Sequence, residues 1–261
     1  MQHTRIARRN SRPLLSVQAA GSILIFCALL SGCGKPKAPT AIPLPFSVTG
    51  RVLLNGVPPP EIVIQMDPAC EKLQPDTNTP PTTRHYVVAP NRGLANVFVS
   101  IRAEFDSMKY PVPTNAMQMS VIACQYQPYV LGARAGQPIA VTVKDSNVLD
   151  NFHFTPKMNK EFNFVHVGGQ QPHIVRLDKP EDFVRAKSDV HPWMFGYICV
   201  VDHPFFAITD TNGSFALPDG LPDGTYTLEA RHLKAGSQKK QITVRNGTSA
   251  NVEFELTVPK R

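Results

Sequence analysis

The sequence lacks most of the features that mark an enzyme. It contains no nucleophile motif, no phosphate-binding loop and no pair of carboxylates in a catalytic context. The metal-binding patterns HExxH and paired CxxC are also missing, although the chain has eight histidines. These absences predict a protein that is not an enzyme.

A long amphipathic helical run is lacking as well. Short stretches alternate apolar with polar residues, and turns rich in glycine, asparagine, aspartate and proline separate them. Alternation with a period of two is typical of half-buried β-strands. We therefore expect an all-β protein, and the 261 − 32 = 229 residues that follow residue 32 allow one large or two small domains.

The chain has little excess charge once its N-terminal segment is set aside. There are 27 Lys plus Arg and 20 Asp plus Glu in the full sequence. Residues 1–32 hold four arginines and no acid, which leaves 27 − 4 = 23 basic residues against 20 acidic ones. No basic patch remains for nucleic acid, so nucleic-acid binding is not expected.

Residues 1–32 resemble the signal peptide of a bacterial lipoprotein. Four arginines precede an apolar segment from about Ala19 to Leu30, which is short for a membrane span. Leu30-Ser-Gly-Cys33 matches a lipobox, which implies a lipid on Cys33 and a place in the cell envelope, facing the periplasm or the exterior. A secretory signal cut elsewhere and a short membrane anchor are the alternatives. Residues 33–45 are rich in proline and predict a tether.

Two segments near the chain ends resemble the carboxypeptidase-regulatory-like (transthyretin-like) β-sandwich. The family pattern is a G-x-V near the start, then TD-x-x-G-x-F-x-L, then LP-x-G-x-Y-x-L. The matching residues are Gly50, Val52, Thr209, Asp210, Gly213, Phe215, Leu217, Leu221, Pro222, Gly224, Tyr226 and Leu228. We expect this sandwich to comprise residues 46–116 and 203–258, with a hairpin turn at Asn212-Gly213 and a further turn at Asp223-Gly224.

Residues 117–202, between those segments, resemble a cupredoxin, a Greek-key β-sandwich that holds type 1 copper. The resemblance implies ligand-bearing loops at residues 145–156 and 187–194. Asn151, His191 and Met194 stand at family positions, but Asp150 replaces the first histidine ligand and Ser188 replaces the cysteine. We expect two Greek-key sandwiches, with the cupredoxin-like one inserted in or following the other; an insertion at a loop costs little chain entropy.

The two replacements predict a degenerate metal site. Type 1 copper requires a thiolate, two imidazoles and a weak methionine ligand. A serine hydroxyl is not a soft donor, and a carboxylate favours harder cations. The candidate metal residues are Asp150, His153, Ser188, His191 and Met194, of which His153 could replace the missing histidine only if its loop bulges. We expect no cofactor, with copper as the alternative.

Three of the five cysteines remain after the signal and the lipidated Cys33 are set aside. An exported protein can form disulfides, and we expect one between Cys70 and Cys124, which both lie at loop or strand ends flanked by proline. Cys199 lies in an apolar strand and is expected to be a buried free thiol. In the alternative, all three thiols are free.

Together these features predict a membrane-anchored envelope lipoprotein that acts as a non-catalytic binding or structural module. Its partners would be the membrane, through the lipid, and an envelope protein or a glycan. The first alternative is a periplasmic copper-binding or electron-transfer protein with altered ligands. The second is a carbohydrate-binding accessory module, although the sequence offers no aromatic platform for a sugar.

Overall fold

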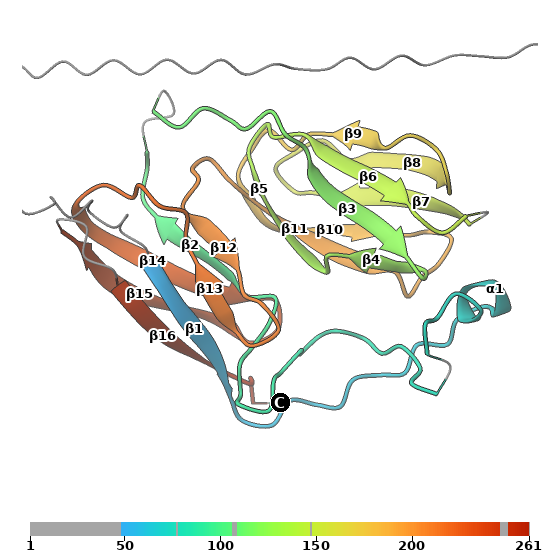
Figure 1. Cartoon of the computed structure of the whole chain (residues 1–261), viewed down its shortest axis with the longest axis horizontal. Coiled ribbons are helices and arrows are strands. Elements are labelled where there is room, and N and C mark those ends of the chain that lie inside the picture. The colour runs from blue at the N-terminus through green and yellow to red at the C-terminus, as the bar shows by residue number, and fades with distance from the viewer. Residues whose placement is uncertain (1–47, 77, 106–108, 147, 246–249, 261) are drawn as a thin grey trace, which may run out of the picture. The chain divides into compact units, whose positions relative to one another are not determined.

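The protein is all-β, and its strands form two β-sandwiches (Figure 1). The structure, a computed structural model, describes residues 48–76, 78–105, 109–146, 148–245 and 250–260. The expected signal peptide, Cys33 and the tether of residues 33–45 lie outside these residues. None of the helices in the described part of the chain is long and apolar enough to cross a membrane.

The first sandwich is built from strands near both ends of the described chain. One sheet has the order β13-β1-β16 and the other the order β12-β2-β14-β15. The strands are β1 (Val48–Asn55), β2 (Phe98–Arg102), β12 (Phe206–Ile208), β13 (Ser214–Ala216), β14 (Gly224–His232), β15 (Gly236–Val244) and β16 (Ala250–Thr257). The central pair, β1 and β16, is parallel, with Val52 opposite Phe254.

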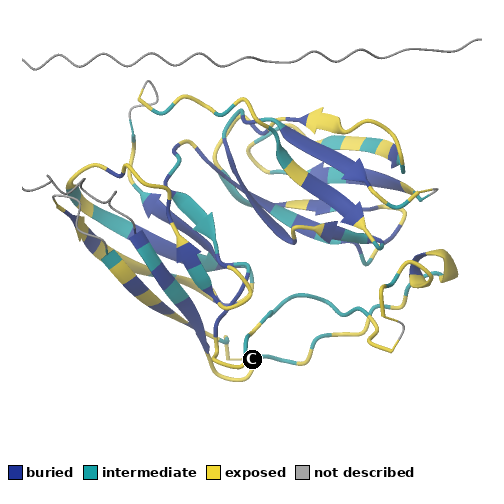
Figure 2. Ribbon diagram, viewed as in Figure 1, coloured by how far each residue is buried: buried dark blue, intermediate teal, exposed yellow. Residues whose placement is uncertain are grey.

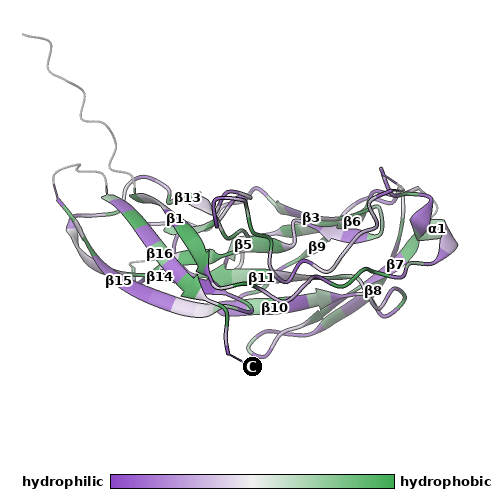
Figure 3. Ribbon diagram, turned by 90° about the horizontal axis from the view of Figure 1, so that it is seen from below, coloured by the Kyte–Doolittle hydropathy of each residue, from purple (hydrophilic) through white to green (hydrophobic). Residues whose placement is uncertain are grey.

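The alternation of apolar residues places one face of each sheet in a common core. On β16, Val252, Phe254 and Leu256 are buried while their neighbours are exposed. They pack with Leu228 of β14 and other apolar residues of both sheets. By contrast, β15 carries mostly hydrophilic residues that face solvent (Figure 3).

The predicted hairpin at Asn212-Gly213 is wrong. The flanking strands β12 and β13 belong to different sheets, so the turn is a corner between them. Gly213 has a φ of +76°, and a Cβ atom there would lie 2.4 Å from the carbonyl oxygen of Val52. The turn residues specify a reversal of the chain, but they do not specify which strand pairs with which.

The second sandwich uses the strands between β2 and β12. Its larger sheet has the order β5-β11-β10-β7-β8 and its smaller sheet the order β4-β3-β6-β9. The strands are β3 (Met117–Ile122), β4 (Gln125–Gln127), β5 (Val130–Arg134), β6 (Ile139–Val143), β7 (Leu149–Thr155), β8 (Phe162–Val167), β9 (His173–Val175), β10 (Glu181–Lys187) and β11 (Phe195–Val201). Its core includes Tyr126, Phe152, Phe154 and Ile198.

Residues 56–90 form a long arm between β1 and β2. Of its described residues, Cys70 alone is buried, and most of the others are exposed (Figure 2). The two limbs of the arm pair with each other, through the Ile64 amide and the Pro81 carbonyl and through a bridge between Val63 and Thr82. At the tip lies α1 (Pro68–Glu71), a single turn.

The arm leaves the sandwich to which the sequence pattern assigns it. The expected boundaries place all of residues 46–116 in the first sandwich, but Met66 and Cys70 pack against the core of the second. A disulfide joins Cys70 to Cys124, in the turn between β3 and β4. Cys199 in β11 is free and buried.

Candidate functional site

The two loops singled out in the sequence meet at one end of the second sandwich. Residues 149–155 form β7, whose inner face carries Asp150, Phe152 and Phe154. Residues 188–194 connect β10 to β11, which lie side by side in the same sheet as β7. Ser188 therefore begins its loop directly beside the inner face of β7.

Asp150, Ser188 and His191 form a buried hydrogen-bonded network. The Ser188 hydroxyl donates a very short hydrogen bond to Oδ1 of Asp150. The same hydroxyl oxygen accepts the backbone N–H groups of Val190 and His191, at 3.0 and 2.8 Å. The Nδ1 atom of His191 lies 3.4 Å from Oδ1 of Asp150. The side chains that would surround a metal ion thus bind one another.

Asn151 fixes the two loops together. Its side-chain oxygen accepts the backbone N–H of Asp189 at 2.7 Å, and its amide nitrogen donates to the Asp189 carboxylate at 3.1 Å. From beneath, the hydroxyl of the buried Tyr126 is 3.1 Å from the Lys187 carbonyl and 3.2 Å from the Asn151 carbonyl. The loops are therefore held from both sides.

Met194 is buried in the core cluster next to this network. Its backbone closes the loop, because its N–H donates to the His191 carbonyl at 2.9 Å and its carbonyl accepts from the Ser188 N–H at 3.1 Å. The loop is thus a closed turn that holds Ser188, His191 and Met194 together.

His153 lies outside the network of Asp150, Ser188 and His191. Strand β7 pairs regularly with β8 from Leu149 to Phe154, without a bulge, so His153 faces outward. Its ring nitrogens lie 2.8 Å from Asp189 and 2.6 Å from Glu161. The Lys187 ammonium group, 2.6 Å away, is the main reason that the pKa of the exposed Asp189 carboxyl lies below its usual range. His153 therefore belongs to a surface ion-pair cluster.

Asp150 is an unusual carboxylate because it is fully buried. Burial raises the pKa of Asp150 above its usual value, although the hydrogen bond from Ser188 acts in the opposite direction. Its Oδ2 atom has no hydrogen-bond partner, and neither has Nδ1 of His166, which is buried directly opposite Asp150 on β8. From the sequence, His166 is one of several histidines of the insert for which a structural or surface role is expected, and nothing in the sequence places it opposite Asp150.

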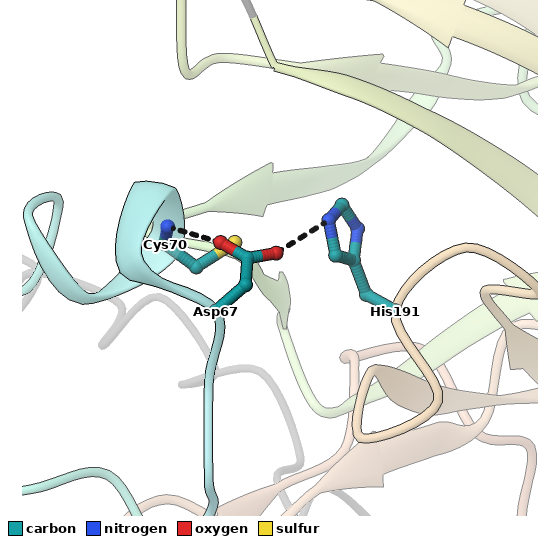
Figure 4. A group of neighbouring side chains, drawn as sticks. All are labelled: Asp67, Cys70 and His191. Carbon is teal, nitrogen blue, oxygen red and sulfur yellow. Dashed lines mark hydrogen bonds and ion pairs between the residues drawn. The ribbon is translucent and has the colours of Figure 1, made fainter.

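The arm covers the outer side of His191 (Figure 4). Oδ2 of Asp67 lies 3.5 Å from Nε2 of His191, whose exposed fraction is only 7%. The other oxygen, Oδ1, caps α1 by accepting the N–H groups of Ala69 and Cys70, both at 2.9 Å. The sequence analysis did not predict this contact. The one local signal is the Asp67-Pro68 pair, which is typical of the start of a helical turn with Asp as the N-cap.

These residues do not fit type 1 copper. In the described part of the chain, the sulfurs near His191 belong to the Met194 thioether and to the Cys70–Cys124 disulfide, and neither supplies a thiolate. Asp67, Cys70 and His191 otherwise hold ligand atoms within 4.8 Å of one another, but a disulfide sulfur is not a thiolate. On the inner side of His191, its Nδ1 atom lies 3.4 Å from Oδ1 of Asp150. This is a hydrogen-bond distance, so the two side chains contact each other directly where a metal ion would lie.

No protein-family model and no curated protein matches the chain. Its neighbours among solved structures are cupredoxins. A copper-containing nitrite reductase (NirK) from Thermus scotoductus SA-01 is 17% identical over 38% of this chain and 27% of that chain, with a TM-score of 0.30. A purple cupredoxin from Nitrosopumilus maritimus is 20% identical over 32% of this chain and 98% of that chain, with a TM-score of 0.28.

A mutant of amicyanin in its reduced Cu(I) form is 17% identical over 39% of this chain and 97% of that chain, with a TM-score of 0.29. The chain thus spans about a quarter (27%) of the nitrite reductase. The likeness of the first sandwich to regulatory-like domains stays a prediction.

Proposed function

We propose that the chain is a lipid-anchored envelope protein that acts as a non-catalytic binding or structural module, in which a hydrogen-bonded network replaces a type 1 copper centre. The observation that carries this proposal is the contact of Ser188 with Asp150 and of Asp150 with His191. These contacts use the groups that would otherwise face a metal.

The arm supports the same conclusion from the outside. In cupredoxins that transfer electrons, redox partners dock on the surface around the C-terminal histidine ligand. Here His191 stands at the position of that ligand. Asp67 of the arm lies 3.5 Å from its Nε2 atom, and a disulfide holds the arm in place. A partner could not reach the edge of His191 without moving the arm.

A second candidate is a copper site with oxygen and nitrogen donors. It is favoured by the unpartnered, buried Oδ2 of Asp150 and Nδ1 of His166 on directly opposing residues. Buried polar atoms are rarely left without a partner. Asp150 and His166 would bind Cu(II), which accepts such donors, but without a thiolate they would not form a type 1 centre.

Metal analysis distinguishes the two candidates. Protein loaded with Cu(II) and dialysed against a chelator should retain only substoichiometric copper if the network replaces the metal. The second candidate instead requires one retained copper, lost in both Asp150→Asn and His166→Gln. His153→Gln is the matched control, because that histidine faces away from the site. Copper that is retained by all three variants would lie elsewhere and would support neither candidate.

A further inference from the structure

Three potential metal donors meet on the outer side of His191, where the arm docks (Figure 4). Asp67, Cys70 and His191 each place a ligand atom within 4.8 Å of the others. Cys124 brings a second sulfur, because it is bonded to Cys70. The set therefore contains two sulfurs, one imidazole nitrogen and one carboxylate oxygen.

We propose that these four residues form a Zn²⁺ site when the Cys70–Cys124 disulfide is reduced. The site uses Nε2 of His191 and lies on the side of the imidazole opposite Asp150. It therefore differs from a type 1 copper site, and it does not depend on the proposed function. Its chemistry is that of structural zinc, which takes four cysteine, histidine or carboxylate donors in a tetrahedron.

The redox step balances with a dithiol as the reductant. The dithiol transfers two electrons and two protons to the disulfide, which becomes two thiols, and the reductant is itself oxidised to a disulfide. Zn²⁺ then displaces the two thiol protons and binds the two thiolates. With a neutral imidazole and one carboxylate, the bound set carries three negative charges against the two positive charges of the ion.

Asp67, Cys70 and His191 require only small movements, whereas the Cys124 sulfur must move away from that of Cys70 after reduction. Donor atoms that share one zinc ion at about 2.0–2.3 Å lie roughly 3.5 Å apart, so separations within 4.8 Å close by shifts on the order of 1 Å. Asp67 can bind through Oδ2 alone, because Oδ1 caps α1. The helical turn and the metal would therefore use different oxygens of one carboxylate.

His191 is already oriented for this role. Its Nδ1 lies 3.4 Å from the buried carboxylate of Asp150, which favours a hydrogen on Nδ1 and leaves Nε2 free to bind a cation. Zinc-binding histidines commonly have such a carboxylate behind them, which fixes the tautomer and the ring orientation. The contact between Asp150 and His191 thus occupies Nδ1 on the inner side and orients Nε2 toward the proposed zinc ion on the outer side.

The turn that carries Cys124 has an unfavourable backbone conformation, which hydrogen bonds hold in place. Ala123 and Cys124 both adopt left-handed conformations, with φ of 49° and 53°, which are unfavourable for residues other than glycine. Both N–H groups are held by the Asp145 carboxylate, at 2.9 and 3.0 Å. A groove of about 550 Å³, lined by residues that include Leu73, Ile122 and Ala123, adjoins the turn. Neither cysteine lines the groove and both are buried, so a reductant reaches the disulfide only when the turn opens.

The experiment compares oxidised with reduced full-length protein in detergent. Protein reduced with a phosphine and freed of it anaerobically should retain one Zn²⁺ against a competing chelator, whereas oxidised protein should retain none. Co²⁺ in place of Zn²⁺ should add a near-ultraviolet thiolate-to-cobalt band. Cys124→Ser and His191→Gln should each lose more affinity than the roughly 10- to 100-fold that loss of an outer partner costs.

Two variants serve as matched controls. Cys199→Ser removes the free buried thiol, and His153→Gln removes a histidine on the other face of β7; both should bind Zn²⁺ as the unmodified protein does. Asp67→Asn keeps an oxygen for the helix cap, so weaker Zn²⁺ binding in that variant would report the ligand role. Equal retention by oxidised and reduced protein, or loss of binding in Cys199→Ser, would overturn the proposal.

Reduction could also loosen the arm, and thermal unfolding measures this effect. If reduction lowers the midpoint temperature of unfolding, Zn²⁺ should restore that temperature in the unmodified protein and should not restore it in His191→Gln. A midpoint that Zn²⁺ leaves unchanged, together with no retained metal, would overturn the proposal as well.

Discussion

At the scale of single residues, Asp150 determines what the site can do. Its carboxylate is fully buried, accepts from Ser188 and contacts His191. Ionisation of a buried carboxylate costs free energy, because burial removes the water that hydrates the charge. The hydrogen bonds offset that cost only in part, since the pKa of Asp150 remains raised.

Asp150→Asn should therefore make the protein more stable at pH 7. The folded-state pKa lies above the unfolded value of 3.8, so ionisation of Asp150 lowers stability as the pH rises through the folded-state pKa. Below the unfolded value both states are protonated, and the advantage of the variant should disappear. Urea unfolding at a series of pH values measures the difference.

Asp189→Asn is the matched control, because the pKa of Asp189 is lowered and its effect should have the opposite sign. An Asp150→Asn protein that is destabilised equally at pH 4 and pH 7 would contradict this account, because it would mean that the charge of Asp150 does not matter.

Several site residues could be predicted from the sequence, and others could not. Asn151, Ser188, His191 and Met194 lie in two short segments whose spacing follows a known loop pattern, so their meeting place was predictable. His166 lies on an ordinary alternating strand, and only its register opposite Asp150 brings it near the site. Register depends on the whole sheet and cannot be read from one strand.

At the scale of elements, the arm is the feature that departs most from expectation. Its sequence is rich in proline and polar residues, and just over half of its described residues are exposed. Its docking depends on a few long-range contacts, such as the hydrogen bond from Arg84 to the Tyr126 carbonyl at 3.0 Å. Such contacts leave no periodic pattern, so the sequence predicted the strands of both sandwiches better than the path between them.

Replacing both Cys70 and Cys124 by alanine should lower the free energy of unfolding by about 4 kcal/mol in the chain-entropy model, since the disulfide spans 54 residues. Guanidinium unfolding of the oxidised protein and of the double variant measures the loss.

Cys199→Ala is the comparison for the disulfide variant, since it also removes a buried sulfur but no cross-link. The disulfide explains the difference only if the double variant loses clearly more stability than this control. Equal losses would show that the arm contributes little to the fold.

At the scale of the whole molecule, the described residues form two sandwiches. The strands of residues 117–201 form sheets of their own, between strands of the other sandwich. The lipid anchor remains a prediction from the sequence, since Cys33 lies outside the described residues.

Cys33→Ala should leave the protein either soluble in the envelope or as an unprocessed precursor, because no thiol remains for the lipid. Membrane fractionation with immunoblotting checks this. Cys27→Ala is the control, since that cysteine lies within the predicted signal peptide. A mature Cys33→Ala protein that still sediments with membranes would show that another segment provides the anchor.

The most direct test of the central claim, that a hydrogen-bonded network occupies the place of a type 1 copper centre, is visible absorption after copper loading and dialysis. The unmodified protein should show no intense thiolate-to-copper band. Asp150→His combined with Ser188→Cys should show one, because it supplies two imidazoles, a thiolate and the thioether of Met194. Asp150→His with Ser188→Ala lacks the thiolate and should stay without the band. An intense band in the unmodified protein, or a folded double variant that stays colourless, would contradict the account.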